Sequence, residues 1–573
     1  MPSRTVYLET FGCQMNELDS ELVSGSLRAL GYRFTTAPGE ADVVLYNTCS
    51  VREHAEQKVW SRLGELALRK KEDPGLVVGV LGCMAERDGV SLIRRMPVVD
   101  VLCGPGELDK LPVLIDNAVK TRESLLSDAS PEAPPADRRS AGQTALQGST
   151  SRRSATLAAA SDSLEMLDLS RSISPADDDG PIKRSAYVRI TRGCNKFCTY
   201  CVVPFTRGAE IHRPPEHIID ECKKLVDAGV TEITLLGQTV NHYRFEHGSA
   251  VTVNGVMQPQ KGRSYAGGHR RDPFAGERVT TFADLLRRIH DEVPALARLR
   301  FVTSYPRDFG DDVLEVIRDH PRICRYLHVP AQSGSDRLLK LMNRGYTIGE
   351  YEEFLARARA ILDQPELGRP LMVSGDIITG FPTETEEDHV ATADLLRRAR
   401  YKNAFIFKYS PRPGTVAFDK LADDVPEDVK RRRNNELLAI QSEISDQISR
   451  EQVGREFSVI VEGLSRHERK RRPAASAKAG PGAVKLTIGG QPADGSDHGG
   501  SACALDAEVS HVHSPPTEPP ASIQLSARTD GDLIVFFDAP ARALEAAQAM
   551  IGSIVRVRVD RAEGLGLHGV LLG

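Results

Sequence analysis

The chain has 573 residues, several times the length of a typical domain, so we expect two to four domains. Hydrophobic residues make up 40% of it, enough for a sizeable core, and its formal net charge of −5 excludes a protein that is basic throughout. No run of about 18 apolar residues occurs and no signal peptide precedes the first apolar run, so we expect a cytoplasmic protein outside the membrane. Ten cysteines in such a chain favour metal or catalytic thiols over disulfides.

The first part of the chain, residues 1–122, alternates strand-length apolar runs with helical stretches. That alternation is typical of a parallel α/β sheet. Residues 123–180 differ, because they are rich in Ala, Ser, Pro and charge and poor in aromatic side chains. This composition predicts a disordered linker.

Six further strand candidates alternate with helices in residues 181–452, which predicts a partial (β/α)₆ barrel with its chemistry at the carboxyl ends of the strands. An insertion at 243–277 follows the second strand and is expected to form a mobile loop. Residues 453–573 contain short strands that predict a small β-barrel, interrupted by a low-complexity insertion, 467–520, without structure. The predicted fold class is therefore α/β, with an N-terminal parallel α/β domain, the partial barrel and the small β-barrel.

Three thiols, Cys194, Cys198 and Cys201, directly follow the first barrel strand with the spacing C-x₃-C-x₂-C, and we call them the barrel triad. Three thiolates on one loop can hold three corners of a [4Fe–4S] cluster and leave the fourth iron open to another ligand. Structural zinc is the alternative, but no fourth ligand stands at a usual spacing. The spacing resembles the radical S-adenosylmethionine (SAM) superfamily, which implies that SAM binds the open iron and is cleaved reductively.

Three other cysteines, Cys13, Cys49 and Cys83, each follow a strand and precede a helix in the N-terminal part, and we call them the sheet triad. Equivalent positions of a parallel sheet meet at one edge, where helix N-termini favour thiolates. The three could hold a second cluster. Cys103 also follows a strand, so its position alone admits it as a fourth ligand, and its role stays open.

Polar or glycine-containing segments follow the later barrel strands and together ring one face of the predicted barrel, including residues 408–414. Each alone is more often an ordinary turn, but as a set they fit a cofactor across the barrel mouth. The candidate SAM contacts are Gly237, Gln238, Ser304, Gln332, Ser333, Gly334, Ser374, Asp376 and Gly380.

The segments around both triads resemble the methylthiotransferases, and within them the branch that acts on isopentenylated adenosine of tRNA. The segments that carry the resemblance are residues 10–16, 19–21, 47–55, 82–85 and 192–207. It covers the N-terminal domain, the barrel and the β tail, which is similar to a TRAM domain. The siblings that act on threonylcarbamoyl-adenosine tRNA or on a ribosomal-protein aspartate share both triads, so the flanking residues carry the choice of substrate.

The resemblance implies a radical SAM tRNA methylthiotransferase with two [4Fe–4S] clusters. In it the barrel triad holds the cluster that cleaves SAM, and the sheet triad holds an auxiliary cluster associated with sulfur donation. Hydrogen is removed from C2 of isopentenyladenosine 37, sulfur is inserted there, and a second SAM supplies the methyl group. The remaining alternative of another class is an iron-sulfur or zinc protein that binds RNA without catalysis.

The expected partners are the tRNA anticodon loop, an electron donor such as flavodoxin or ferredoxin, and sulfur and iron-sulfur assembly machinery, with the chain as a monomer. Basic runs in the tail could neutralise tRNA phosphates, although some could be ordinary solvated faces. These residues are Lys430, Arg431, Arg432, Arg433, Arg455, Arg466, Arg469, Lys470, Arg471, Arg472, Arg528, Arg556, Arg558 and Arg561. Phe536 and Phe537 could stack on bases, with at least one of them in the barrel core.

Overall fold

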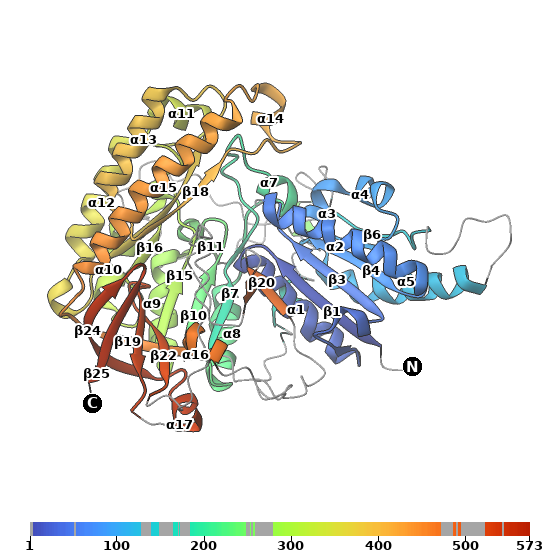
Figure 1. The fold of residues 1–573 in the computed structure, drawn as a ribbon, viewed down its shortest axis with the longest axis horizontal. Helices are drawn as coiled ribbons and strands as arrows, with labels where there is room; N and C mark the ends of the chain where they lie inside the picture. Colours follow the sequence, from blue (N-terminus) through green and yellow to red (C-terminus); the bar gives the residue numbers. More distant parts are fainter. Residues whose placement is uncertain are drawn as a thin grey trace.

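The structure is a computed structural model. It describes residues 4–50, 53–127, 139–147, 164–169, 171, 184–247, 252–253, 256–257, 279–471, 485–488, 491–493, 522–540 and 544–572. Figure 1 shows an N-terminal α/β unit on one side of the molecule, a central set of parallel strands, and a small β-barrel at the C-terminal end. In these parts of the chain, no helix combines the length and the apolar character needed to cross a membrane.

The N-terminal unit is a sheet with the strand order β21-β20-β1-β3-β4-β5-β6, in which β2 also pairs with β1. Its strands are β1 (Thr5–Phe11), β2 (Arg33–Phe34), β3 (Val43–Thr48), β4 (Val77–Gly82), β5 (Val101–Cys103), β6 (Gln143–Ala145), β20 (Lys485–Ile488) and β21 (Gln491–Ala493). Its helices are α1 (Gln14–Ala29), α2 (Glu53–Glu72), α3 (Cys83–Asp88), α4 (Val90–Arg95) and α5 (Leu111–Ser127). Successive strand residues point to opposite faces, so Leu8 packs with α1 and α5, whereas Tyr7 packs with α2, α3 and α4.

All six predicted barrel strands are present and form two parallel sheets, β15-β10-β7 and β16-β17-β18, which a bridge between Leu299 and Ile323 connects. The strands are β7 (Ser185–Arg189), β10 (Glu232–Leu236), β15 (Arg298–Phe301), β16 (Tyr326–His328), β17 (Met372–Thr379) and β18 (Asn403–Lys408). The main helices are α8 (Pro215–Asp227), α9 (Phe282–Glu292), α10 (Asp311–Asp319), α12 (Ile348–Leu362), α13 (Glu386–Ala399) and α15 (Glu427–Arg450). Short helices α7 (Val203–Thr206), α11 (Asp336–Leu341) and α14 (Val416–Lys420) lie in the connections. The prediction of a partial (β/α)₆ barrel is confirmed.

The predicted small β-barrel is also present as a closed barrel with the strand order β19-β22-β23-β25-β24. Its strands are β19 (Glu456–Leu464), β22 (Gln524–Thr529), β23 (Ile534–Asp538), β24 (Ile554–Glu563) and β25 (Gly566–Leu572), with α16 (Arg466–Arg471) and α17 (Leu544–Ala549) beside them. Phe537 is buried in its core, whereas Phe536 is half-buried beside His568.

The turn between β22 and β23, residues 529–532, covers the amino end of the central barrel, and we call it the plug. Arg300, on β15, donates to the carbonyl oxygen of Thr529 at 2.6 Å and to the Glu232 carboxylate at 2.6 Å. The Lys402 ammonium lies 2.5 Å from a carboxylate oxygen of Asp532. Because Glu232 and Lys402 lie at the starts of β10 and β18, the small barrel docks at the end of the strands opposite their carboxyl ends.

The prediction that residues 123–180 form a disordered linker differs from the structure in three described segments, the first of which is the end of α5, which continues to Ser127. Strand β6 extends the N-terminal sheet by pairing with β5. A short helix, 164–169, buries Leu164 and Leu167 one turn apart, and its Asp168 pairs with Arg189 and Arg192 on the barrel side. Leu164, Met166, Leu167 and Leu169 are apolar, but six residues within low-complexity sequence are too few for a periodic pattern to indicate a helix.

The two later insertions also contain described pieces. Strand β20, within 467–520, pairs in parallel with β1, so this part of the insertion joins the N-terminal sheet. The prediction that residues 467–520 have no structure is therefore wrong for this strand. In the insertion 243–277, β11 (Arg244–Glu246) pairs with β14 (Val279–Thr281), which follows it, and β12 (Thr252–Val253) pairs with β13 (Val256–Met257). Most other residues of both insertions lie outside the described parts of the chain.

Candidate functional site

The barrel triad lies on the loop between two short antiparallel strands, β8 (Thr191–Arg192) and β9 (Ile211–His212). The loop begins at Gly193, whose φ is +67°. No other residue fits at this position, because a Cβ there would lie 2.1 Å from the Ala209 carbonyl oxygen. The amide of Cys194 donates to the Gly208 carbonyl oxygen at 3.2 Å, and the amide of Cys201 donates to the Cys198 carbonyl oxygen at 3.0 Å. These bonds fix the loop so that three sulfur atoms share one small region.

The thiols of the loop lie close enough to shift one another's pKa, and the guanidinium of Arg344 contacts one of them. Burial, followed by the charge of Glu210, raises the pKa of Cys194 to about 11. Burial also raises the pKa of Cys201, and the thiols of Cys198 and Cys194 raise it further. Arg344 Nη1 donates to Cys198 Sγ at 3.4 Å. Three soft sulfur donors beside a half-buried guanidinium fit an anionic iron-sulfur cluster.

The sheet triad follows three strand ends that lie side by side. Phe11 on β1 pairs with Thr48 on β3, and Thr48 pairs with Gly82 on β4. The triad cysteines come one or two residues after these positions, at the carboxyl edge of the sheet. Adjacent strands are about 4.8 Å apart, so the shared register brings the three thiols together although they are far apart in sequence.

The backbone around the sheet triad is packed without spare room. A Cβ on Gly12 would lie 2.9 Å from the Cβ of Cys49, so only glycine allows that approach. Cys83 opens α3 and is buried, and both burial and the charge of Cys13 raise its pKa, while the Arg207 guanidinium lowers it. The triad therefore has a cation of its own, supplied from the segment that follows the barrel triad.

Two asparagines hold the edge of the sheet to α1. Asn16 Nδ2 donates to Asn47 Oδ1 at 3.0 Å, and Asn47 Nδ2 donates to the Asn16 carbonyl oxygen at 2.8 Å. Cys13 Sγ donates to Asn16 Oδ1 at 3.3 Å. Because both asparagines are fully buried, their amides fix the spacing between the helix that follows Cys13 and the strand that precedes Cys49.

Arg412 connects the two triads. It lies in the segment 408–414, and its guanidinium is 3.5 Å from the Glu56 carboxylate. Burial lowers the pKa of Arg412, and among the charges that raise it are the thiols of Cys49 and Cys201, one from each triad. Because α3, which begins at Cys83, also contacts α7, which follows Cys201, the two triads lie side by side with the half-buried Arg412 near both.

The remaining described cysteines are separate from both triads. Cys103 is fully buried in the N-terminal core, its thiol donates to the Glu107 carbonyl oxygen at 3.2 Å, and burial raises its pKa well above the usual value. Cys222 and Cys324 are likewise buried, with pKa values raised first by burial. A thiol that is buried, protonated and bonded to a carbonyl has a packing role, so nothing here supports Cys103 as a fourth ligand.

Some candidate SAM contacts offer a polar group toward the barrel mouth. The hydroxyl of Ser304 is buried and has no hydrogen-bond partner among the described residues. Gln332 has a φ of +73°, and Asp376 lies 3.2 Å from His328 Nε2. Gln238 is half-buried beside Gly237, where a Cβ would lie 2.2 Å from Thr191 Oγ1. An unpartnered buried hydroxyl is a group that a bound cofactor could satisfy.

The other candidates have partners within the protein. Gly334 packs on α13, where a Cβ would lie 2.3 Å from a backbone oxygen, and its amide donates to Thr392 Oγ1, which also contacts Ser333. Ser374 is fully buried and bonded to the hydroxyl of Tyr326 at 2.6 Å. Gly380 has a φ of +72° and lies against the Lys430 side chain. In the structure these residues shape the strand ends and present no free polar side chain.

The comparisons with known proteins agree with this arrangement. Residues 5–104 match the family model described as "Uncharacterized protein family UPF0004", and residues 188–396 match the radical SAM superfamily. The chain is 43% identical over 464 residues to a tRNA-2-methylthio-N(6)-dimethylallyladenosine synthase of Rhodopirellula baltica, covering 81% of this chain and 85% of that protein. The protein of that name from Phocaeicola vulgatus is 39% identical, covering 82% of this chain and 87% of that one.

This chain belongs to the tRNA-2-methylthio-N(6)-dimethylallyladenosine synthase family. Among solved structures, the radical SAM methyltransferase TsrM of Kitasatospora setae matches 73% of this chain and 77% of its own, with 15% identity and a TM-score of 0.43, too distant to bear on the assignment. Membership of the synthase family implies [4Fe–4S] clusters and SAM as cofactors and tRNA as the substrate.

Some of the basic residues predicted to bind RNA are buried in this member of the synthase family, and others are exposed on the small barrel. Arg528 is buried and paired with Glu462 and Asp532, so the prediction that it meets phosphate is wrong. Lys430 and Arg433 are likewise buried against acidic partners. The exposed arginines of the small barrel lie along one face of β24, since Val557 and Val559 between them point into the core. These exposed residues are Arg556, Arg558 and Arg561.

Sequence reasoning missed the cations that serve the triads. Arg344, Arg207 and Arg412 come from three different segments, and each approaches a thiol only in the folded chain. Arg207 and Arg412 lie within segments that the sequence placed near the chemistry, so position gave a partial signal. Arg344 follows α11 in no recognisable motif, and only the fold could reveal it.

Proposed function

We propose that this chain is a tRNA methylthiotransferase that converts N6-isopentenyladenosine at position 37 to its 2-methylthio derivative. The observation that carries the proposal is that the two thiol triads lie side by side, because α3, which begins at Cys83, contacts α7, which follows Cys201. Two neighbouring triads of thiols suit a reaction in which the cluster of one triad generates a radical and the cluster of the other supplies sulfur. In that reaction hydrogen leaves C2 of the adenine, sulfur takes its place, and a second SAM provides the methyl group.

On this proposal the barrel triad holds the cluster that cleaves SAM, and the sheet triad holds the auxiliary cluster. When bound, the first cluster and SAM supply a carbon radical strong enough to remove a purine C–H hydrogen. Arg344 and Arg207 balance the negative charge of the thiolates, and the hydroxyl of Ser304 can accept or donate a hydrogen bond to SAM. The half-buried Arg412, beside Glu56, keeps a positive charge near both sites.

The other candidate SAM contacts, and the division of labour among the domains, are part of the same proposal. Residues 1–122 would supply the auxiliary site, residues 181–452 the radical chemistry, and residues 453–573 contacts to the tRNA anticodon loop. The exposed arginines on β24 support the last assignment, because periodic cations on one strand face can neutralise successive phosphates. We further propose a cytoplasmic monomer that receives electrons from a flavodoxin or ferredoxin and its clusters and sulfur from the assembly machinery.

Mass spectrometry of tRNA nucleosides tests the proposal. A strain that lacks the protein should lose 2-methylthio-N6-isopentenyladenosine and accumulate the unmethylthiolated nucleoside, and the intact gene should restore the product. A Cys49→Ala gene is the matched control, since it should leave the product absent. Loss of the methylthio form of threonylcarbamoyl-adenosine instead would contradict the substrate and point to the sibling enzymes.

Anaerobic reconstitution separates the enzyme from an RNA-binding protein without catalysis. The enzyme should hold about eight irons per chain, four for each cluster, and should form 5′-deoxyadenosine only with a reductant. Stoichiometric zinc bound by the triads, with no cleavage of SAM, would overturn the proposal.

A further inference from the structure

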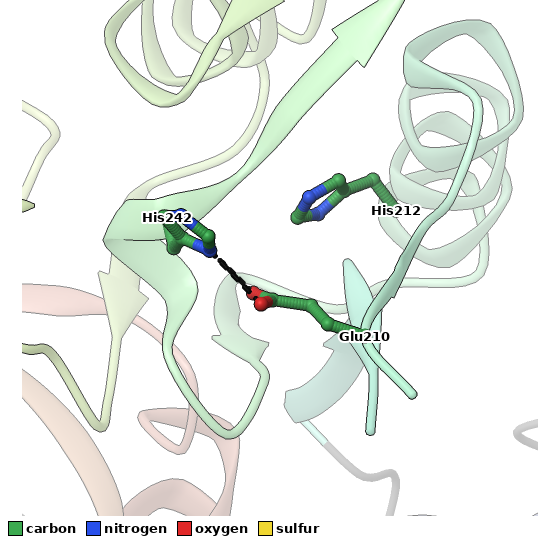
Figure 2. Close-up of side chains that lie close together, drawn as sticks. All are labelled: Glu210, His212 and His242. Carbon is green, nitrogen blue, oxygen red and sulfur yellow. Dashed lines mark hydrogen bonds and ion pairs between the residues drawn. The ribbon is translucent and has the colours of Figure 1, made fainter. Parts of the chain in front are cut away.

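A third group of potential metal ligands lies next to the barrel triad but belongs to neither triad. Glu210 and His212 lie at β9, and His242 ends the short helix η5 (Val240–His242) that follows β10. One ligand atom from each lies within 4.8 Å of the others. Figure 2 shows the three side chains converging on one point from two separate segments of the chain.

The geometry of the group leaves nitrogen atoms without partners inside the protein. His242 Nδ1 lies 2.9 Å from both carboxylate oxygens of Glu210, so this nitrogen has a partner within the protein. Both ring nitrogens of His212, and Nε2 of His242, are buried without a hydrogen-bond partner among the described residues. His212 is 4% exposed and Glu210 is 2% exposed. A buried imidazole with both nitrogens unsatisfied is costly and calls for an ion or a water molecule.

The local charges suit a divalent cation. Burial by itself would raise the pKa of Glu210, but the hydrogen bond and charge of His242 and the charges of other neighbouring cations lower it. Burial lowers the pKa of His212 to about 4, so its imidazole is neutral, which is the form that binds metals. Two other cations near the group are already compensated, since Lys196 lies 2.5 Å from the Asp308 carboxylate and Arg244 is paired with Glu246.

We propose that Glu210, His212 and His242 bind a zinc ion. Two imidazoles and one carboxylate form one of the ligand sets that hold zinc with a fourth position left for water. The atoms need to close by about an ångström to reach zinc-ligand distances of about 2.1 Å, a shift that side-chain rotation can supply.

Two other groups with the same residue types lack this setting. In the group of His290, Asp291 and His320, the side chain of Asp291 is 59% exposed. In the group around His389, the two glutamates are 51% and 44% exposed. An exposed carboxylate is already satisfied by water and needs no ion. The buried group is the one in which an ion replaces missing contacts.

The position of the site gives the ion a structural role for the barrel triad. β9 is the strand that ends the loop of the triad, and Thr239, which precedes η5, places its hydroxyl 3.9 Å from Cys194 Sγ. The amide of Glu210 donates to the side chain of Asn195, next to Cys194. A bound zinc would therefore join the two segments that flank Cys194 and hold the loop in place.

X-ray absorption at the zinc edge of the full-length holoenzyme tests the proposal, since iron in the clusters does not contribute there. The protein is exposed to zinc, passed over a mild chelating resin and analysed for metals. We expect about one zinc per chain besides the irons, with only nitrogen and oxygen ligands at about 2.0–2.1 Å. Sulfur ligands at about 2.3 Å would show zinc in a cysteine site and would overturn the proposal, as would absence of retained zinc.

Substitutions assign the ion to these residues. His212→Ser and His242→Ala should each weaken zinc binding by at least about 100-fold, more than loss of an outer hydrogen-bond partner costs. The matched control His320→Ala, in the exposed group, should retain zinc. Iron content and circular dichroism report whether each variant is folded. If folded variants of His212 and His242 keep their zinc, the ion lies elsewhere and the proposal fails.

Discussion

The two triads bring three thiols together by different means. The barrel triad lies on one loop, fixed by Gly193 and a few backbone hydrogen bonds, so its geometry is local. The sheet triad comes from three βα units and depends on the register of β1, β3 and β4. A local site tolerates changes elsewhere in the fold, whereas a distributed site is only as accurate as the sheet that carries it.

The largest expected effect breaks the local site alone. Cys201→Ala should reduce 5′-deoxyadenosine formation by at least about 1,000-fold, equivalent to about 4 kcal/mol, because a cluster with two thiolates cannot present an open iron to SAM. Iron should fall from about eight to about four per chain, since the sheet triad keeps its cluster. Iron analysis and chromatography of the nucleoside measure both. Cys222→Ala, at a buried cysteine of α8, is the control and should change neither.

Breaking the distributed site should separate two activities. Cys49→Ala should also halve the iron, but reductive cleavage of SAM should continue within about threefold of the intact enzyme while the methylthio product disappears, because the barrel triad is intact. Equal loss of both activities would mean that the two sites are not independent. Assays of 5′-deoxyadenosine and of modified tRNA in the same reaction decide between these results.

A smaller effect tests the connection between the two halves. Burial by itself would raise the pKa of Asp168, but Arg189, Arg192 and Arg213 hold it well below its usual value. Asp168→Asn removes the carboxylate that these three buried arginines share and leaves them only their other acidic partners, Asp19, Glu165 and Glu221. It should cost about 3 kcal/mol of unfolding free energy in the apoprotein at pH 7. Denaturant titration measures it. The exposed Asp220→Asn on α8 should change stability by less than about 0.5 kcal/mol.

The same residue gives a pH dependence of known sign. A carboxylate with a depressed folded pKa contributes its full stability above the unfolded pKa of about 3.9 and loses it as the pH falls further. The intact apoprotein should therefore lose stability more steeply than Asp168→Asn between about pH 5 and pH 3. Parallel slopes for the two proteins would contradict the assignment of the ion pairs.

The smallest effect concerns the register of the sheet. Gly82 has a φ of +87°, and a Cβ there would lie 2.4 Å from Asn47 Oδ1, so Gly82→Ala should destabilise the protein by about 2–3 kcal/mol and lower the occupancy of the auxiliary cluster. Gly31 has a φ of +88° with no atom within 4 Å of the added Cβ. Gly31→Ala should therefore cost only about 1 kcal/mol and leave the iron content unchanged. Iron analysis beside denaturant titration compares the two.

Sequence predicted the parts of this protein that repeat a pattern. The strand and helix order of the sheet and barrel follows from periodic apolar runs, and the convergence of the sheet triad follows from its equivalent positions in three βα units. The small barrel follows from short alternating strands. Each of these depends on local spacing and on the regular geometry of parallel or antiparallel pairing, so no long-range contact had to be known.

What sequence could not predict depends on contacts between distant segments. The helix 164–169 and strand β20 lie in low-complexity sequence, and their partners, Arg192 and β1, are elsewhere in the chain. The burial of Arg528 and Lys430 follows from acidic partners that no spacing rule connects to them. The sequence of a basic run does not indicate whether its side chains face solvent or pair with carboxylates inside the protein.

The plug has a consequence for how the molecule folds. Arg298 and Arg300 lie near the amino ends of the barrel strands, buried, and bond to the Arg528 and Thr529 carbonyl oxygens of the turn that arrives more than two hundred residues later. Without that turn the carbonyl oxygens would be missing and the two guanidinium groups would have to stay hydrated, although Arg300 would keep its ion pair with Glu232. We therefore expect the central barrel and the small barrel to unfold as one cooperative unit, because neither can bury these two arginines without the other.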